Sequence, residues 1–264
     1  MAQNLSAAIC PWLDVVTDME WFNFKNGFSL GALKPLRKFM IRPDLLHAAA
    51  QFWDPEVHVF RIGYSELCPT LGEFGKYLAC FPSAQYTIPK LRTDIVRTLR
   101  ENLGVSAGRA GFLLQENQLN VRQIIADFIP ATGGAGIRRP SSYYFALCLC
   151  LLAAFVFVPG DGRVSRQIVE VAVQLKERKN VAPMILAETL LGLDAVRRGE
   201  TQTFGGCPLA LQMWICDKFR ILRVPRANWI YTASSFVGRV WEVSPRTRED
   251  WVDFIGSRRV EYIE

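Results

Sequence analysis

Residues 51–82 constrain the fold more than any other part of the chain, because they specify three consecutive elements (QFWDPEVHVFRIGYSELCPTLGEFGKYLACFP). The WDP step at 53–55 predicts a helix end, since the residue before a proline avoids the helical conformation. Residues 57–62 predict a short strand that is apolar on much of both faces. Thr70 and Glu73 predict a capping box, in which each side chain satisfies a backbone donor of the other residue. These patterns specify architecture and assign no function by themselves.

Two blocks of this sequence resemble the plant mobile domain family, and they occur in the family's order. The first block is carried by Phe52, Trp53, Asp54, Pro55, Val59, Phe60, Glu66, Leu67, Cys68, Pro69, Thr70 and Leu71. The second block is carried by residues 187–190, Leu193, Asp194 and residues 206–214. With the connecting helices, the resemblance covers most of the chain from about residue 35 to residue 241. We therefore expect an N-terminal aromatic-rich segment at 1–34 and a plant mobile domain at 35–264.

The resemblance also implies a biological setting. The family shares a history with retrotransposons, and its cellular members are nuclear plant proteins of transposon silencing and genome maintenance. Some of them act with a serine/threonine phosphatase-like partner. The family motif residues are expected to be mainly structural: Trp53, Asp54, Pro55, Glu66, Pro69, Thr70, Glu188 and Trp214.

The label "aminotransferase-like", which is attached to the family, implies no activity for this chain. An aminotransferase needs a Schiff-base lysine, a phosphate cup for its cofactor and a partner for the cofactor's ring nitrogen. The eight lysines lie mostly beside charged or turn residues, and the chain is short for that fold. We therefore reject this activity and predict no cofactor, no metal and no catalytic residues.

The composition fits a globular protein of a reducing compartment. The 264 residues, half of them hydrophobic, can bury a substantial core in one large domain or two small ones. The formal charge of +6 is modest, and a mixed, solvated surface is favoured over an anionic partner as its explanation. The seven cysteines are irregularly spaced and mostly have apolar neighbours, so we expect buried thiols rather than a disulfide framework.

Neither a secretory signal nor a membrane span is expected. The N-terminus has no basic region followed by an apolar core and a cleavage site. The apolar run at 143–158 (YYFALCLCLLAAFVFV) is shorter than the roughly 18 residues that a spanning helix needs. Pro159 and Gly160 then end it, so we predict a buried core helix.

Helical periodicity recurs through most of the remaining chain, whereas residues 1–28 carry aromatic clusters with only weak periodicity. Asp44, Asn120 and Thr247 (with Asp250) are predicted N-caps, and Gly104 is a predicted C-terminal stop. Predicted helices cover about 91–103, 120–128, 141–158, 163–178, 180–199, 208–219 and 247–255, and a short strand is expected at 260–263. The predicted fold is mainly α, a compact multi-helix globular domain with a few short β-strands. The loop at 132–140 could separate two subdomains near 130–140.

Three small constellations have both a chemical and a structural interpretation. The glycines at 133–136, followed by Arg138 and Arg139, could cradle a phosphate, but their spacing matches no phosphate-binding motif and a linker is favoured. Cys148 and Cys150 lie about 200° apart on a helix, so two buried thiols are favoured over a metal site. The third constellation is the pair of histidines discussed next.

His47 and His58 could meet across the WDP corner near Asp54 or Glu56, although a structural or surface role is favoured. Glu188 and Asp194 lie near Arg197 and Arg198 in the second motif block. A buried glutamate on such an apolar helix needs a partner, so we predict a structural ion pair that holds the two blocks together.

A basic and aromatic strip runs through the C-terminal part of the chain. Its main candidates for a nucleic-acid or partner surface are Arg220, Arg223, Arg226, Trp229, Arg239 and Arg246. Phosphate contacts combined with base stacking could use this mixture. Interleaved acidic residues dilute the charge, so a solvated face with buried aromatics is favoured over a binding surface.

Three functions follow from these observations. The first is a non-catalytic nuclear module that binds a protein partner, with the phosphatase-like protein as the candidate that the resemblance supplies. The second is a nucleic-acid-binding module that uses the C-terminal strip. The third is a remnant enzyme of transposon origin, which would need clustered carboxylates that the sequence spacing does not show.

Overall fold

The computed structural model describes residues 5–80, 86, 94–130, 139–159, 164–223, 236–237, 239–243 and 245–258, and helices predominate in them. The first helices are α1 (Leu5–Val15), α2 (Asp18–Phe28), α3 (Leu33–Leu36), α4 (Pro43–Ala50), α5 (Leu71–Leu78), α6 (Ile95–Leu103), α7 (Ala107–Leu113) and α8 (Val121–Phe128). The later ones are α9 (Ser141–Leu151), the π-helix η1 (Leu152–Val156), α10 (Ile168–Lys176), α11 (Ala182–Arg197), α12 (Pro208–Lys218) and α13 (Arg248–Gly256).

The strands are few and short. The strands β1 (Trp53–Asp54), β2 (Val59–Ile62) and β3 (Ser65–Leu67) form an antiparallel sheet in chain order. Its register pairs Trp53 with Phe60 and Phe60 with Leu67. A second hairpin joins β4 (Leu114–Gln115) to β5 (Gln118–Leu119). The predicted fold class, mainly α with a few short strands, is confirmed.

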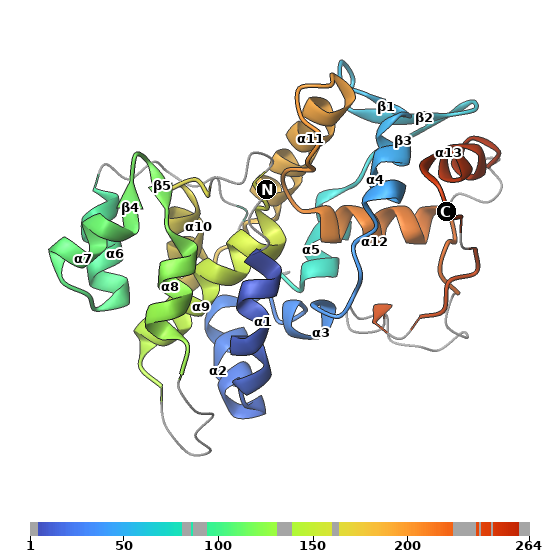
Figure 1. The fold of residues 1–264 in the computed structure, drawn as a ribbon. Helices are drawn as coiled ribbons and strands as arrows, with labels where there is room; N and C mark the ends of the chain where they lie inside the picture. The colour runs from blue at the N-terminus through green and yellow to red at the C-terminus, as the bar shows by residue number, and fades with distance from the viewer. Residues whose placement is uncertain are drawn as a thin grey trace.

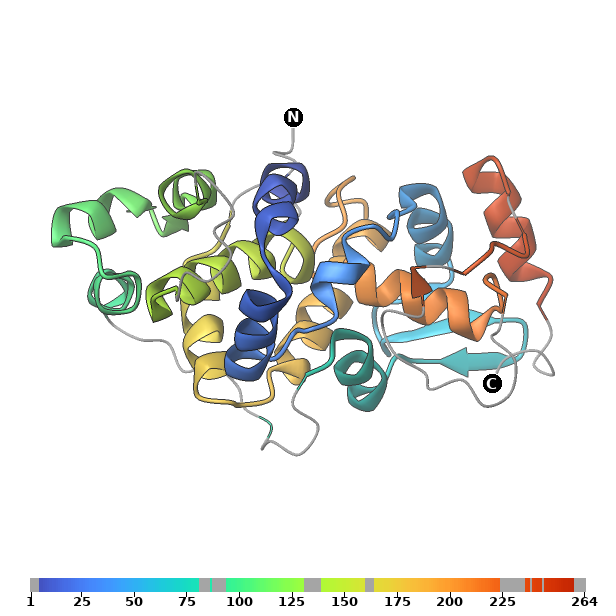
Figure 2. The same cartoon turned by 90° about the horizontal axis from the view of Figure 1, so that it is seen from below.

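The molecule is elongated (Figures 1 and 2). Helices α6, α7 and α8 with the β4–β5 hairpin form one end, and the three-stranded sheet with α4 and α13 forms the other (Figure 1). Helices α1, α2, α9 and α10 occupy the middle, and α11 and α12 run toward the sheet. The buried apolar side chains form one continuous cluster from α1 to α13.

The apolar run at 143–158 is a buried helix, as predicted. Residues 145–153 are at most 1% exposed, and α9 continues directly into the π-helix η1. The amide of Phe157 donates to the carbonyl of Leu152 (2.7 Å), which is the i+5 bond of a π-turn. Within the described ranges, no helix combines the length and apolarity needed to cross a bilayer.

The prediction of weak periodicity in the N-terminal segment was wrong, because α1 and α2 lie there. Thr17 and Glu20 form a capping box at the start of α2, and the Trp12 indole donates to the Tyr143 hydroxyl at 2.9 Å. Leu5, Ile9, Trp12 and Leu13 make the buried stripe of α1. Both the stripe spacing and the Thr-x-x-Glu signature are present in the sequence, and each is typical of a helix at this place.

The WDP corner differs from its prediction. Helix α4 ends at Ala50, and Trp53 and Asp54 form strand β1 rather than the helix end. The next strand begins at Val59 rather than residue 57, since His58 has a positive φ of 55° and turns the chain. Asp44 is not the N-cap of α4: Arg42 takes that position, and Pro43 fills the first turn.

Several local predictions are confirmed. The capping boxes of Thr70 with Glu73 and of Thr247 with Asp250 are both formed. The Asn120 side chain accepts from the amide of Gln123 at the start of α8. Gly104 closes α6 with a left-handed φ of 68°. The predicted loop at 132–140 falls mostly in residues 131–138, and the strand at 260–263 falls in residues 259–264, both outside the described residues.

Glu73 does more than cap its helix. Its carboxylate accepts from Thr70, from the Trp214 indole (3.2 Å) and from the Lys218 ammonium (2.9 Å). Burial disfavours the charge, but the bonds from Lys218 and Thr70 outweigh it and hold the pKa of Glu73 below its ordinary value of 4.5. Glu73 therefore joins α5 to α12 through a charge.

We expect the charge on Glu73 to make the free energy of unfolding depend on pH. The unfolded chain binds the Glu73 proton at higher pH than the folded chain, so stability rises with pH between the two pKa values. Glu73→Gln should lose about 1–2 kcal/mol at pH 7, near the low end for charged bonds because the pair is partly exposed. The difference from wild type should shrink as the pH falls below 4.5, in urea unfolding at several pH values.

Asp250→Asn is the matched control, because Asp250 is a capping acid whose bonds are all local. Its loss at neutral pH should be smaller than that of Glu73→Gln. Equal losses in the two variants would show that Glu73 contributes only as a cap.

Candidate functional site

The two motif blocks meet in one buried contact. The Trp53 indole donates to Asp194 Oδ1 (2.7 Å), and His58 Nε2 lies 3.1 Å from Asp194 Oδ2. Arg197 Nε donates to the Trp53 carbonyl (3.2 Å). The first block is thereby fixed to helix α11, but by hydrogen bonds of Asp194 and Arg197 and not by the predicted ion pair of Glu188 with an arginine.

The other motif residues are also bonded or packed within this region. The Trp214 ring stacks on Phe60 with centroids 5.3 Å apart. Arg61 bridges Asp54 (2.6 Å) and Glu66 (3.1 Å) across the sheet. Pro69 is buried, Pro55 is half-buried in the turn, and Thr70 caps α5.

Two of the described arginines of the C-terminal strip form ion pairs with acids of this chain. Arg223 pairs with Glu242 at 2.8 Å. The Arg239 side chain is only 4% exposed and pairs with Asp217 (3.1 Å), which also accepts from Tyr77 (2.9 Å). Arg220 and Arg246 are exposed, whereas Arg226 and Trp229 lie outside the described residues.

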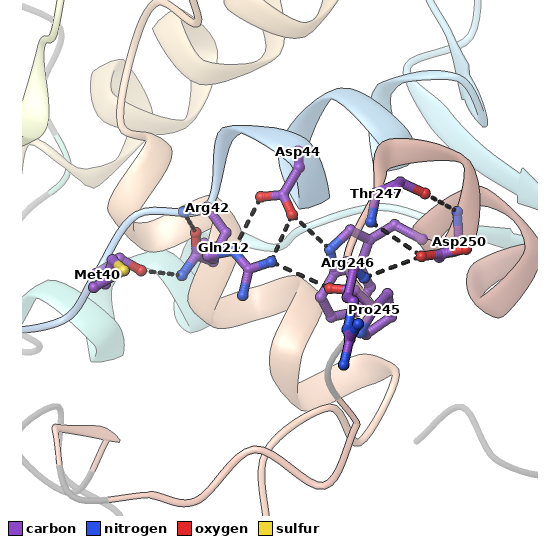
Figure 3. A network of polar contacts seen from close by, with 9 residues as sticks. Met40, Arg42, Asp44, Gln212, Pro245, Arg246, Thr247 and Asp250 are labelled. Atoms are coloured by element: carbon purple, nitrogen blue, oxygen red, sulfur yellow. Dashed lines mark hydrogen bonds and ion pairs between the residues drawn. The ribbon is translucent and has the colours of Figure 1, made fainter.

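Figure 3 shows how Arg246 lies beside a polar network that fixes α13 to α4. The Arg42 guanidinium bonds to Asp44 (2.6 and 3.0 Å) and to the Pro245 carbonyl (3.3 Å). The Trp251 indole donates to Asp44 (3.0 Å), and the amide of Arg246 donates to Asp250 (3.1 Å). Asp44, predicted as a helix cap, therefore serves as a tertiary anchor.

The smaller constellations are structural where they are described. His47 packs against the Phe204 ring, and burial together with Arg248 lowers its pKa. The Cys148 and Cys150 thiols are fully buried, which raises the pKa of each. The glycines at 133–136 lie outside the described residues. Across the described chain, no three His, Cys, Asp or Glu side chains are arranged to hold a metal ion.

A pocket beside Glu188, called the Glu188 pocket below, is the most site-like feature. It has a volume of about 320 Å³ and lies between the end of η1, α10, α11 and the loop before α12. Its walls are mainly apolar, and Ser165, Gln167 and Thr201 add neutral polar groups. Glu188 is the one charged side chain among the described residues that line it.

One wall of the pocket depends on glycine. Gly206 has a φ of 78°, and a Cβ there would lie 2.5 Å from Thr189 Cα on α11. A Cβ at Gly192 would likewise clash with the backbone of Gly205. The Cys207 amide donates to Thr189 Oγ1 (3.0 Å), and Gly206 pairs with Val158 in both directions (2.8 and 3.1 Å). The loop and α11 are therefore in backbone contact, and the pocket is preformed.

Glu188 is a partly buried acid without a described ion-pair partner. Its side chain is half-buried, and no described cation lies within ion-pair distance of its carboxylate. Burial alone raises its pKa above the ordinary value, because no neighbouring charge offsets the lost hydration. The predicted arginine partner is absent among the described residues, since Arg197 contacts Trp53 and Arg198 lies near Glu56 (3.6 Å). The arrangement can bind a cation or donate a proton.

Sequence reasoning singled out Glu188 but missed the pocket around it. The signal that could have found it is the pair of glycine sites, Gly192 and Gly205-Gly206, spaced to allow close backbone approach. Comparisons with known proteins do not assign the site: the chain matches no protein-family model, no curated protein and no solved structure. The plant mobile domain resemblance stays a prediction.

The glycine wall gives a test with an internal control. Gly206→Ala and Gly199→Ala both place an alanine at a positive φ, which costs about 1–2 kcal/mol. A Cβ at Gly199 meets nothing within 4 Å, whereas one at Gly206 meets the backbone of α11. Gly206→Ala should therefore lose about 3 kcal/mol or more in urea unfolding. Equal losses would contradict the backbone contact.

Proposed function

We propose that this chain is a non-catalytic protein-interaction module of the plant mobile domain type, and that it captures a basic side chain of its partner in the Glu188 pocket. The proposal is supported mainly by the unpaired, half-buried carboxylate of Glu188 inside a mainly apolar pocket whose other described lining residues are uncharged. The volume of about 320 Å³ is at the lower end for ligand pockets, and suits one long side chain and part of its neighbour.

The energetics favour a cation with an apolar stem. The Glu188 carboxylate has lost part of its hydration and gains no compensating contact from the described chain. A bound ammonium or guanidinium group would supply that contact, and the carbon stem of lysine or arginine would cover Phe157, Ile168 and Met184 on the pocket wall. The neutral groups Gln167 and Thr201 add no competing charge.

Recognition accounts for this chemistry better than catalysis does. General acid–base catalysis by a carboxylate is usually completed by a second titratable group or a nucleophile held within hydrogen-bond reach. The described lining residues of the pocket offer hydroxyls at Ser165 and Thr201, but no histidine and no second acid that could activate them. The remnant-enzyme alternative therefore has no supporting observation here.

The biological setting comes from the resemblance alone. It proposes a nuclear plant protein of transposon silencing and genome maintenance, with a serine/threonine phosphatase-like protein as one partner. The two motif blocks that carry the resemblance make direct contacts through Trp53 and Asp194 and through Phe60 and Trp214. These contacts support a single module containing both blocks.

The ligand chemistry can be tested with two peptide libraries. One carries a central lysine or arginine between apolar residues, and the other carries norleucine at that position. We expect binding of the basic library only, measured by fluorescence anisotropy. Glu188→Gln keeps the side-chain shape and should weaken binding about tenfold or more, since a charged hydrogen bond contributes about 1.5–3 kcal/mol.

Glu249→Gln is the control, because it removes the same charge from an exposed site on α13. It should bind like wild type. Equal binding of both libraries, or equal loss in both variants, would exclude the Glu188 carboxylate as the recognition element.

A further inference from the structure

A second hollow, lined by cations, lies between α2, α3 and Ala79, the residue that follows α5. It is called the basic groove below. It has a volume of about 700 Å³, and Val237 closes one side. Four cations line it: Lys25, Lys34, Arg37 and Lys38. Asp18 is the one acid among the described lining residues. None of these residues was singled out by the sequence, and none lines the Glu188 pocket.

Two of the four cations are held by acids of this chain, and two have no such partner among the described residues. Lys34 lies 3.5 Å from Asp18, whose side chain is fully exposed, and Arg37 pairs with the exposed Asp14 at 2.7 Å. The Lys34 and Arg37 side chains are only 18% and 16% exposed. Lys34 also donates to the Val16 carbonyl (2.8 Å) and Arg37 to the Lys34 carbonyl (2.9 Å), so both are fixed charges in the groove wall. Lys25 and Lys38 are exposed and have no carboxylate partner among the described residues. A concave surface lined by one sign of charge focuses its field and concentrates anions.

Aromatic rings accompany these cations. Lys34 Nζ lies 6.0 Å from the Trp21 ring, and Trp21 lines the groove. Lys25 Nζ lies 5.1 Å above the Phe22 ring, which is half exposed. The Trp21 ring is held by stacking on Phe24 with centroids 4.8 Å apart. Cations beside exposed or partly exposed rings are the combination that tracks a phosphate backbone while bases stack.

We infer that this groove binds single-stranded nucleic acid. The exposed Lys25 and Lys38 contact phosphates, and Lys34 and Arg37 add fixed positive charge to the wall. Trp21 in the groove and the exposed Phe22 beside it offer surfaces on which bases stack. The groove is concave, it has a clear excess of positive charge, and its rings lie beside the cations, which favours a flexible single strand over a rigid duplex. This function is independent of the Glu188 pocket and uses different residues from the C-terminal strip.

The test measures binding of a labelled oligothymidylate of about 16 nucleotides across a salt series by fluorescence anisotropy. Wild type should bind with an affinity that falls as salt rises. Lys25→Glu/Lys38→Glu should weaken binding at least about tenfold and reduce the log–log salt slope by about 1.4, or about 0.7 per lost contact. Phe22→Ala should weaken binding of the single strand more than binding of a duplex of the same length, since only unpaired bases can stack on the Phe22 ring.

Arg97→Glu/Arg100→Glu provides the matched control, because it makes the same change in net charge on the exposed face of α6, at the far end of the molecule (Figure 1). This variant should bind like wild type, with only the small loss expected from net charge. Equal losses in the two double variants would overturn the groove as the site. Binding to phosphatidylserine vesicles with none to the oligonucleotide would also overturn the proposal, in favour of a membrane surface.

Discussion

The bonded carboxylate of Glu73 is the interaction on which the sheet end of the molecule depends. It satisfies the start of α5 through Thr70 and the indole and ammonium groups of α12 through Trp214 and Lys218. Trp214 in turn stacks on Phe60, the central residue of the three-stranded sheet. Glu20 has the same two roles at α2, where it completes a capping box with Thr17 and pairs with Arg139 at 2.7 Å. A cap is a local feature, but a cap that also binds a distant partner fixes tertiary structure.

This double role explains how much of the fold could be predicted from the sequence. Capping boxes, a glycine stop and the apolar helix at 143–158 follow from spacings of a few residues, and they were found. The missed parts depend on distant partners. Trp53 and Asp54 form a strand because they pair with Phe60 and Val59 of the next strand. Asp44 does not cap α4, and its carboxylate instead accepts hydrogen bonds from the Arg42 and Trp251 side chains. The helices α1 and α2 are the exception, since their local signals were present in the sequence.

The candidate site was predicted only in part, and helix geometry explains the error. Arg197 and Arg198 follow Asp194 by three and four residues, so both lie near the face of Asp194 at the end of α11. Glu188 precedes Asp194 by six residues, which places it about 240° around the helix axis. One acid therefore faces Trp53 and the other faces the pocket, and a single arginine cluster cannot serve both. The pocket itself could not be read from spacing, because it requires the backbone of residues 205–206 to approach α11.

Glu188 differs from the other motif residues, because it makes no described contact that stabilises the fold. Trp53, Glu73, Asp194 and Trp214 stabilise the module through one another, so replacing any of them perturbs structure. Glu188 belongs to the same motif block but stabilises no described contact, and its burial costs hydration energy. That cost is present in the free chain, and the proposed binding of a cation in the pocket would offset it. A residue of this kind is therefore expected to govern affinity far more than stability, which is what distinguishes a recognition residue from a structural one.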